Sequence, residues 1–221
     1  MSVTKKGFSS KEIQKQLGLK RYEPVWAMVH KLRKAMGTRD EKYTLEGMIE
    51  FDEGYFTVES SEIEQENGIR GRGAAGKQNV AVMAESVPLE DLETGEKSKS
   101  CRYFKAKVLE THLSLEINET IKESIDNQSI VFTDKSTSYV DISDFVELHI
   151  TEKSDKETTK ETLKWVHITI SNAKRNLLGN YHKIKRKYLQ LYLNEFIYKL
   201  NRRYFGDKLF ERLIIANITA V

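Results

Sequence analysis

The sequence contains almost no cysteine or proline and no long hydrophobic run. Its 221 residues include one cysteine, Cys101, and two prolines, Pro24 and Pro88. A single cysteine excludes an intrachain disulfide and any metal site built from several cysteines. No stretch approaches the roughly 18 consecutive apolar residues of a membrane helix, and the first residues lack the apolar core of a signal peptide. These absences predict a cytoplasmic protein with no membrane partner.

Charge is nearly balanced in total but is unevenly distributed along the chain. The net charge is +3, from 36 basic and 33 acidic residues. Basic residues concentrate in "KWVHITISNAKR" and "KIKRK", whereas acids concentrate in "TVESSEIEQENG" and "LEDLETGE". A short basic run can simply be the solvated start of a helix. The asymmetry also fits a surface that binds a polyanion such as nucleic acid.

The first 43 residues carry the pattern of two helices joined by a short turn. In "SSKEIQKQLGL" a serine can cap the first helix and Gly18 can end it; "RYEPVWAMVHKLRKAMG" predicts a second helix that ends at Gly37. This outline is typical of a helix-turn-helix, although many helical hairpins share it. The second helix is basic, and we expect its Lys31 and Arg33 to contact DNA. We therefore predict that residues 1–43 form a DNA-binding helix-turn-helix segment.

Residues 44–221 alternate between strand and helix patterns. Strands are predicted at "GMIEFDEGYFTV", "NVAVMAES" and "RYFKAKVL", a helix at "ETHLSLEINETIKESI", and further strands at "SIVFTD" and "FVELHIT". A charged linker, "EKSDKETTKE", and a series of helices follow. This order predicts an α/β fold in which helices flank a mixed sheet.

Two acids occupy unusual positions in the predicted strands. Asp52 lies in the middle of "MIEFDEGYF", and an acid within a strand must pair, bind a cation or face solvent. Asp134 closes "SIVFTD", where an aspartate is also a common turn residue. Carboxylates that converge at one end of a sheet suit Mg²⁺ or Mn²⁺, as in two-metal phosphodiester chemistry. Glu53, next to Asp52, should point to the opposite face, towards solvent or a basic neighbour.

Four motifs in order give the sequence a recognisable pattern. Together "FDEGYF", "VFTDKSTSY", "WVHITISNAKRNLLGNYH" and "YLNEFIYKLNRR" resemble the DDE-type insertion-sequence transposases of the retroviral-integrase superfamily. The resemblance extends from about residue 5 to about residue 212. It is greatest to the branch with Glu, Asn or His at the third catalytic position and a lysine seven residues later. It implies an RNase H-like fold for residues 44–221, the predicted catalytic domain with its C-terminal helices.

The resemblance also assigns the active-site residues. Asp52 and Asp134 would be the first two catalytic positions and metal ligands. His167 would be the third, because it precedes Lys174 by seven residues. Asn172 is the alternative, and His167 could instead be a packed structural histidine. A neutral imidazole brings no charge and suits Mn²⁺ better than Mg²⁺.

Further basic residues would contact the DNA backbone. The resemblance implies this role for Lys174, and we expect it for Arg175 as well. The stretch "GIRGRGAAGK" offers Arg70 and Arg72 in a glycine-rich loop that could grip phosphate or could be a plain hairpin turn. It lacks the GxxxxGK[ST] pattern of a nucleotide-binding loop.

The expected function is DNA transposition. Two Mg²⁺ or Mn²⁺ ions would support cleavage at transposon ends and transfer of the 3′-OH into target DNA. The partners would be double-stranded DNA and further copies of the chain, as a homodimer or higher oligomer associated with the nucleoid. One alternative is a related RNase H-like nuclease that cuts structured DNA. Another is a truncated, inactive DNA-binding copy, because the paired-cysteine zinc ribbon of this branch does not precede the helix-turn-helix.

Overall fold

The computed structural model describes residues 7–59, 76–90, 95, 97–111, 113–139, 141–153, 155, 161–181 and 184–219. By its internal contacts the chain divides into two compact units. The sheet unit comprises residues 43–56 and 77–172, and the helical unit comprises residues 1–42, 57–76 and 173–221. Among the described helices, none combines the length and the hydropathy that crossing a membrane requires.

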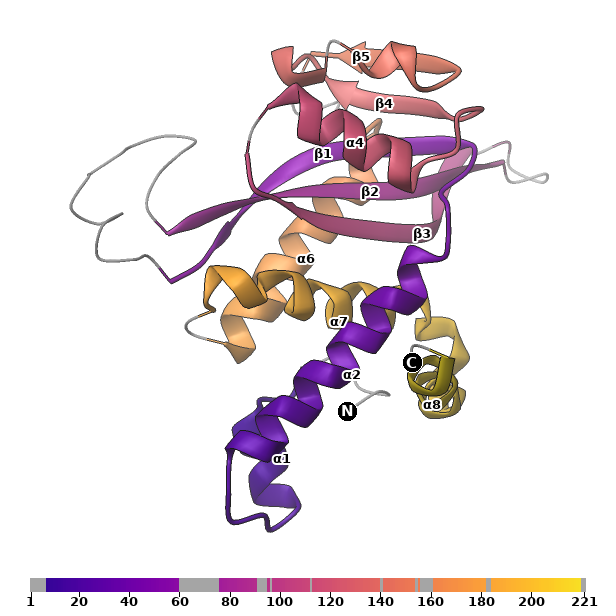
Figure 1. The fold of residues 1–221 in the computed structure, drawn as a ribbon. Helices are drawn as coiled ribbons and strands as arrows, with labels where there is room; N and C mark the ends of the chain where they lie inside the picture. Colours follow the sequence, from indigo (N-terminus) through magenta and orange to yellow (C-terminus); the bar gives the residue numbers. More distant parts are fainter. Residues whose placement is uncertain are drawn as a thin grey trace. The chain divides into compact units, whose positions relative to one another are not determined.

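The sheet unit is built on five strands in the order β3-β2-β1-β4-β5 (Figure 1). Strands β2 and β3 pair antiparallel, whereas β4 pairs parallel with both β1 and β5. This mixed sheet with flanking helices is the RNase H-like arrangement, so the predicted fold class is confirmed. The strands are β1 (Met48–Thr57), β2 (Lys77–Glu90), β3 (Lys97–Leu109), β4 (Ile130–Asp134) and β5 (Leu148–Glu152).

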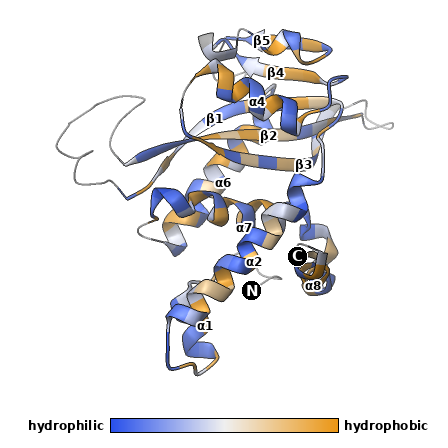
Figure 2. Ribbon diagram, in the orientation of Figure 1, coloured by the Kyte–Doolittle hydropathy of each residue, from blue (hydrophilic) through white to orange (hydrophobic). Residues whose placement is uncertain are grey.

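One face of the sheet packs against helix α4 (Ser114–Ser124), which lies across the strands in Figure 1. Side chains in a strand alternate between faces, so Ile49 and Phe51 of β1 both point into this core with Ile117 and Ile121 of α4. In Figure 2 α4 shows both hydrophobic and hydrophilic residues, as expected for a helix with one face on a core. Two 3₁₀ turns, Thr137–Tyr139 and Ile142–Asp144, connect β4 to β5.

The other face of β1 carries Glu50, Asp52 and Gly54, and it meets the first half of helix α6 (Lys164–Asn180). The closest approach is at Gly54. A Cβ atom at this position would lie 3.1 Å from Cγ2 and 3.3 Å from Cγ1 of Ile170. Glycine therefore lets α6 pack directly on the strand that carries Asp52.

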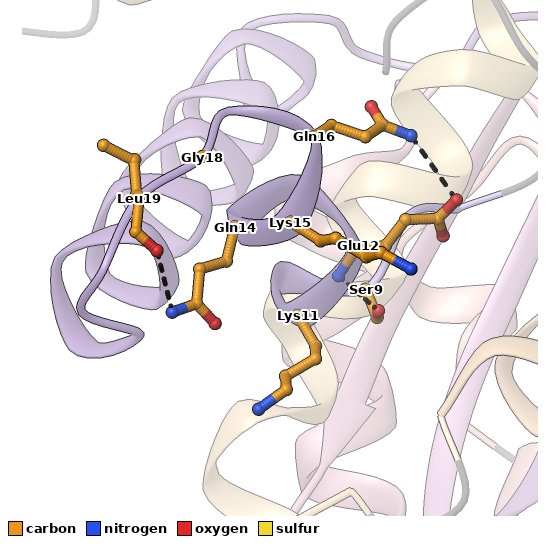
Figure 3. A pocket seen from close by; sticks show the side chains of 8 residues that line it. All are labelled: Ser9, Lys11, Glu12, Gln14, Lys15, Gln16, Gly18 and Leu19. Atoms are coloured by element: carbon orange, nitrogen blue, oxygen red, sulfur yellow. Dashed lines mark hydrogen bonds between the residues drawn. The ribbon is translucent and has the colours of Figure 1, made fainter.

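The helical unit begins with α1 (Ser10–Gln16), whose predicted start and end are confirmed. The Ser9 hydroxyl accepts a hydrogen bond from the Glu12 amide at 3.1 Å, and Gly18 ends the turn with φ of +64°. Figure 3 shows the shallow pocket beside this helix, where the Gln14 side chain donates to the Leu19 carbonyl at 3.1 Å. All eight lining residues come from the single segment 9–19.

Helix α2 (Glu23–Glu41) is longer than predicted. The predicted end at Gly37 is wrong, because the helix continues for four more residues, to Glu41. A Cβ atom at Gly37 would overlap the side-chain amide of Asn194, so this glycine serves helix packing. The remaining helices of the unit are α7 (Leu189–Asn201), α8 (Leu209–Thr219) and the 3₁₀ segments Arg186–Tyr188 and Arg203–Lys208.

Candidate active site

The parallel pairing of β1 with β4 brings Asp52 and Asp134 to neighbouring positions. Met48 pairs with Ile130 and Glu50 with Phe132. The paired register ends there, and the same offset continued by two residues would set Asp52 opposite Asp134. Asp134 is the last residue of β4, and its Oδ1 accepts a hydrogen bond from the Ser136 amide at 3.2 Å. Asp134 therefore makes the hydrogen bond expected of a turn aspartate. It also ends the strand that neighbours β1.

His167 comes to the same place from helix α6. Its Nδ1 lies 3.7 Å from Oδ2 of Asp52, with side-chain exposures of 32% for His167 and 17% for Asp52. Burial lowers the pKa of His167, and the Asp134 carboxylate partly opposes this lowering. The ring is therefore neutral near pH 7 and keeps a nitrogen lone pair that a cation can share.

Glu50 holds the start of α6 and was missed from the sequence. Its Oε2 accepts hydrogen bonds from the amides of Trp165 at 2.7 Å and Val166 at 3.2 Å, the first turn of the helix. Its side chain is fully buried, and Lys99 lies 4.0 Å away. Burial raises the pKa of Glu50 to about 7, although the two amides and Lys99 oppose this rise. The available signal was its position two residues before Asp52, on the same face of the strand.

Glu53 lies on the opposite face of β1 from Asp52, as expected, but its partners differ from the prediction. Its carboxylate accepts hydrogen bonds from the Tyr139 hydroxyl at 3.2 Å and from the side-chain amide of Asn79. The side chain is half-buried, so it keeps some contact with solvent, and its protein partners are a buried hydroxyl and a buried amide. Burial, followed by the carboxylates of Glu53, Asp52 and Asp134, raises the pKa of the Tyr139 hydroxyl far above its usual range.

The donor types at this site suit a divalent cation. Carboxylate oxygens are the ligands of Mg²⁺ and Mn²⁺, and a neutral imidazole can complete the coordination of Mn²⁺. Among the residues that the structure describes, no group of three or more His, Cys, Asp or Glu side chains is close enough to hold an ion as it stands. Two neighbouring carboxylates repel each other. A cation between Asp52 and Asp134 would offset this repulsion.

A comparison with models of known protein families identifies the family of the chain. Residues 44–201, more than half of the chain, match the model of the ISXO2-like transposase domain. The chain belongs to the ISXO2-like transposase family. This membership confirms the predicted DDE transposase family. Members of that family typically use divalent metal ions and act on DNA. A search of the curated proteins finds no match.

In this ISXO2-like chain the residues predicted to contact DNA occupy different environments. Lys174 is half-buried and Arg175 is exposed, both in α6, and Lys31 is exposed on α2. Asn172, the alternative third position, is half-buried in α6. Arg70 and Arg72 lie outside the described residues.

Arg33 was predicted to contact DNA, but the structure buries it. Its side chain has no exposed surface, and its Nε donates to Oε2 of Glu195 at 2.9 Å. Its Nη2 donates to the Tyr181 hydroxyl at 2.8 Å, and its guanidinium lies 4.0 Å from the centre of the Tyr192 ring. A guanidinium enclosed in this way cannot reach a DNA phosphate. The prediction that Arg33 binds DNA is therefore wrong, because the basic pattern of α2 does not distinguish its buried face from its exposed face.

Proposed function

We propose that this chain is the catalytic core of a DNA transposase that cleaves the ends of its element and joins the freed 3′-OH to target DNA. The proposal is supported by His167 Nδ1 at 3.7 Å from Asp52 Oδ2, with Asp134 at the end of the neighbouring parallel strand, within an ISXO2-like transposase domain. Asp52 and Asp134 would hold two divalent ions as anionic ligands, and His167 would add a neutral nitrogen. Ions held there activate the attacking oxygen and stabilise the leaving one.

The two reactions use the same group of side chains. In cleavage, a water oxygen attacks the phosphorus at the element end, the P–O3′ bond breaks, and the 3′ oxygen leaves and gains a proton. In joining, that 3′-OH attacks a target phosphate, a new P–O bond forms, and the old 3′ oxygen departs. Asp52 and Asp134 would act in both steps by holding the cations, because carboxylates on their own repel a phosphate. Water must be excluded in the second step, because it would compete with the 3′-OH.

The basic residues of the chain would position the DNA. Lys174 lies seven residues after His167 in α6, close to two helical turns, so the two residues share one side of that helix. We propose that Lys174, Arg175 and the exposed Lys31 contact phosphates of double-stranded DNA, with the same role for Arg70 and Arg72. Because an element has two ends, we propose that at least two copies act together.

Strand joining by purified protein tests this proposal. A labelled duplex that ends in the element's terminal 3′-OH would be incubated with plasmid in Mn²⁺, beside the Asp134→Asn variant. We expect labelled plasmid from the wild type and none from the variant, while both retard the duplex equally in a gel. Cleavage without joining would indicate a nuclease, and equal joining by Asp134→Asn would refute the assigned site.

A further inference from the structure

A hydrogen-bonded cluster lies beside the predicted metal ligands and has no role in the mechanism so far. It consists of Glu53, Tyr139 and Asn79. Tyr139 and Asn79 are 2% and 3% exposed, and both donate to the Glu53 carboxylate, one to each oxygen. Tyr139 follows β4 in the turn that begins after Asp134, and Asn79 lies in β2. Three segments of the sheet unit therefore converge to fix one carboxylate.

The Tyr139 hydroxyl shows that this carboxylate is close to the site. Tyr139 follows Asp134 by five residues, and its hydroxyl donates a hydrogen bond at 3.2 Å to Glu53, the residue after Asp52. The aromatic ring of Tyr139 also packs edge-on against Phe51, which fixes its position in the core. Glu53 is consequently held at a set place relative to Asp52 and Asp134.

The ligands of the proposed site carry less negative charge than two divalent cations carry positive charge. Two divalent cations carry four positive charges, whereas Asp52 and Asp134 supply two negative charges. A glutamate at the third position would supply another, but this chain has His167 there, and an imidazole carries no negative charge whether or not it is protonated. A scissile phosphate contributes one negative charge when DNA is bound. Without DNA, the ions would therefore be poorly neutralised unless another carboxylate lies nearby.

We propose that Glu53, fixed by Tyr139 and Asn79, supplies the third negative charge of the metal site without coordinating the ions. The inference rests on the proposed function. Glu53 follows Asp52 in the strand, so the two side chains leave β1 on opposite faces and cannot both reach the same ions. Its effect acts through the electric field, which is strong because the surrounding groups are buried. Glu53 is therefore a positioning and charge-balancing residue, and Asp52, Asp134 and His167 remain the ligands.

The substitution Glu53→Gln tests the charge while it preserves the shape. The glutamine carbonyl oxygen can still accept from Tyr139, and rotation of the Asn79 amide lets its own oxygen accept from the new glutamine amide. The negative charge is then the main loss. We expect the Mn²⁺ concentration at half-maximal plasmid nicking to rise by about tenfold, the scale seen when partners of metal ligands are removed. The rate at saturating Mn²⁺ should change little. Direct Mn²⁺ binding, followed by the electron paramagnetic resonance signal of free Mn²⁺, should weaken by a similar factor.

A matched control is available at Glu85. This glutamate is 2% exposed and accepts from the Tyr43 hydroxyl at 3.2 Å, as Glu53 does from Tyr139, and it also pairs with Arg102 at 3.2 Å. Glu85→Gln should leave Mn²⁺ binding at the wild-type value. Equal weakening in both variants would show a general effect of buried charge and would overturn the proposal.

A second substitution that restores a carboxylate near the metal site distinguishes an electrostatic role of Glu53 from a structural one. In the Glu53→Gln background, His167→Glu restores a carboxylate at the third position, and Mn²⁺ affinity should return towards the wild-type value. Failure of rescue, with both variants folded by circular dichroism, would argue for a structural role of Glu53. If Glu53→Gln does not fold, Tyr139→Phe removes one of its two donors and should raise the Mn²⁺ requirement. Wild-type Mn²⁺ dependence of Tyr139→Phe would then contradict the inference.

Nicking by wild-type protein and Mn²⁺ binding by Glu53→Gln distinguish the proposed function from the role of Glu53. If wild-type protein does not nick DNA, or nicks it without Asp52, the proposed function is wrong. If nicking requires Asp52 but Glu53→Gln has normal Mn²⁺ binding, only the inference about Glu53 is wrong.

Discussion

At position 54 the lack of a side chain decides how closely α6 packs on β1. A Cβ atom there would lie 3.1 Å from a methyl carbon of Ile170, in a helix that also carries His167. We expect Gly54→Ala to lower the free energy of unfolding by about 1–3 kcal/mol, the usual cost of overpacking. If α6 yields to the new methyl group together with Ile170, His167 should move away from Asp52, and Mn²⁺-dependent nicking should slow. Urea denaturation and the nicking assay measure the two effects.

Gly179 provides the control for this substitution. It lies in the same helix, and a Cβ atom there would meet nothing within 4 Å. Gly179→Ala should therefore keep or raise stability, by up to about 1 kcal/mol, because alanine favours a helix more than glycine does. If Gly54→Ala is as stable as wild type, the close approach of α6 does not depend on the missing side chain.

His30 should make stability depend on pH. It is buried between the rings of Trp26 and Tyr188, and burial, with a smaller effect of Arg33, lowers its pKa from 6.5 to about 4. Between these pH values the unfolded chain binds a proton that the folded chain does not, so the free energy of unfolding should fall as pH drops from 6.5 to 4.

The variant His30→Phe isolates this effect. Its stability, from urea denaturation at several pH values, should decline less steeply than that of wild type over the same interval. The difference between the two proteins reports His30 alone, because His149 and His167 are present in both. Parallel curves would show that His30 is not buried as a neutral ring.

At the scale of single residues, the sequence indicates which side chains are in unusual positions, but it does not indicate their hydrogen-bond partners in the fold. Asp52 was predictable because a carboxylate in an apolar strand requires an explanation. Glu50 lies in the same strand, but its role depends on the amides of Trp165 and Val166, more than 100 residues away. Tyr139 and Asn79 around Glu53 were also invisible, because no local pattern reports which distant side chains a fold brings together.

At the scale of elements, the buried arginine of α2 gives a clear test. Arg33 pairs with Glu195 of α7 at 2.9 Å, and both side chains are buried. Removal of one partner from a buried ion pair typically costs about 3–5 kcal/mol, so Arg33→Met should lower stability on that scale. Arg33→Lys should also be destabilising, because a lysine cannot reproduce the two hydrogen bonds to Glu195 and Tyr181.

Lys31 is the matched position for DNA binding. It is exposed on the same helix. We expect Lys31→Ala to reduce the dependence of DNA affinity on salt by about one phosphate contact, whereas Arg33→Lys should leave that slope unchanged. The slope comes from gel-shift titrations at several salt concentrations. A reduced slope in folded Arg33→Lys would indicate that Arg33 reaches DNA after all.

Element types followed from the sequence more reliably than element ends. The alternation in β1 and the four-residue spacing in α4 are local properties, so both elements were predicted near their observed bounds. The end of α2 was wrong because Gly37 looks like a stop signal in isolation. Its actual function, close packing against Asn194, depends on α7.

At the scale of the whole molecule, the chain is organised in a way that no linear boundary describes. The sequence suggested a division at residue 43, with all later helices in the catalytic domain. By internal contacts, residues 173–221 group with residues 1–42 in one compact unit. The contact between Arg33 and Glu195, for example, joins residues 162 positions apart. Sequence composition does not predict such contacts.

The central claim is that Asp52 and Asp134 form a metal-dependent phosphodiester site. The most direct measurement is nicking of supercoiled plasmid by the purified chain in Mn²⁺, Mg²⁺ or EDTA, beside Asp52→Asn. The structure predicts nicking in Mn²⁺, weaker nicking in Mg²⁺ because His167 is a neutral nitrogen donor, and none in EDTA or with Asp52→Asn. Nicking that persists in EDTA, or in a folded Asp52→Asn preparation, would contradict the account.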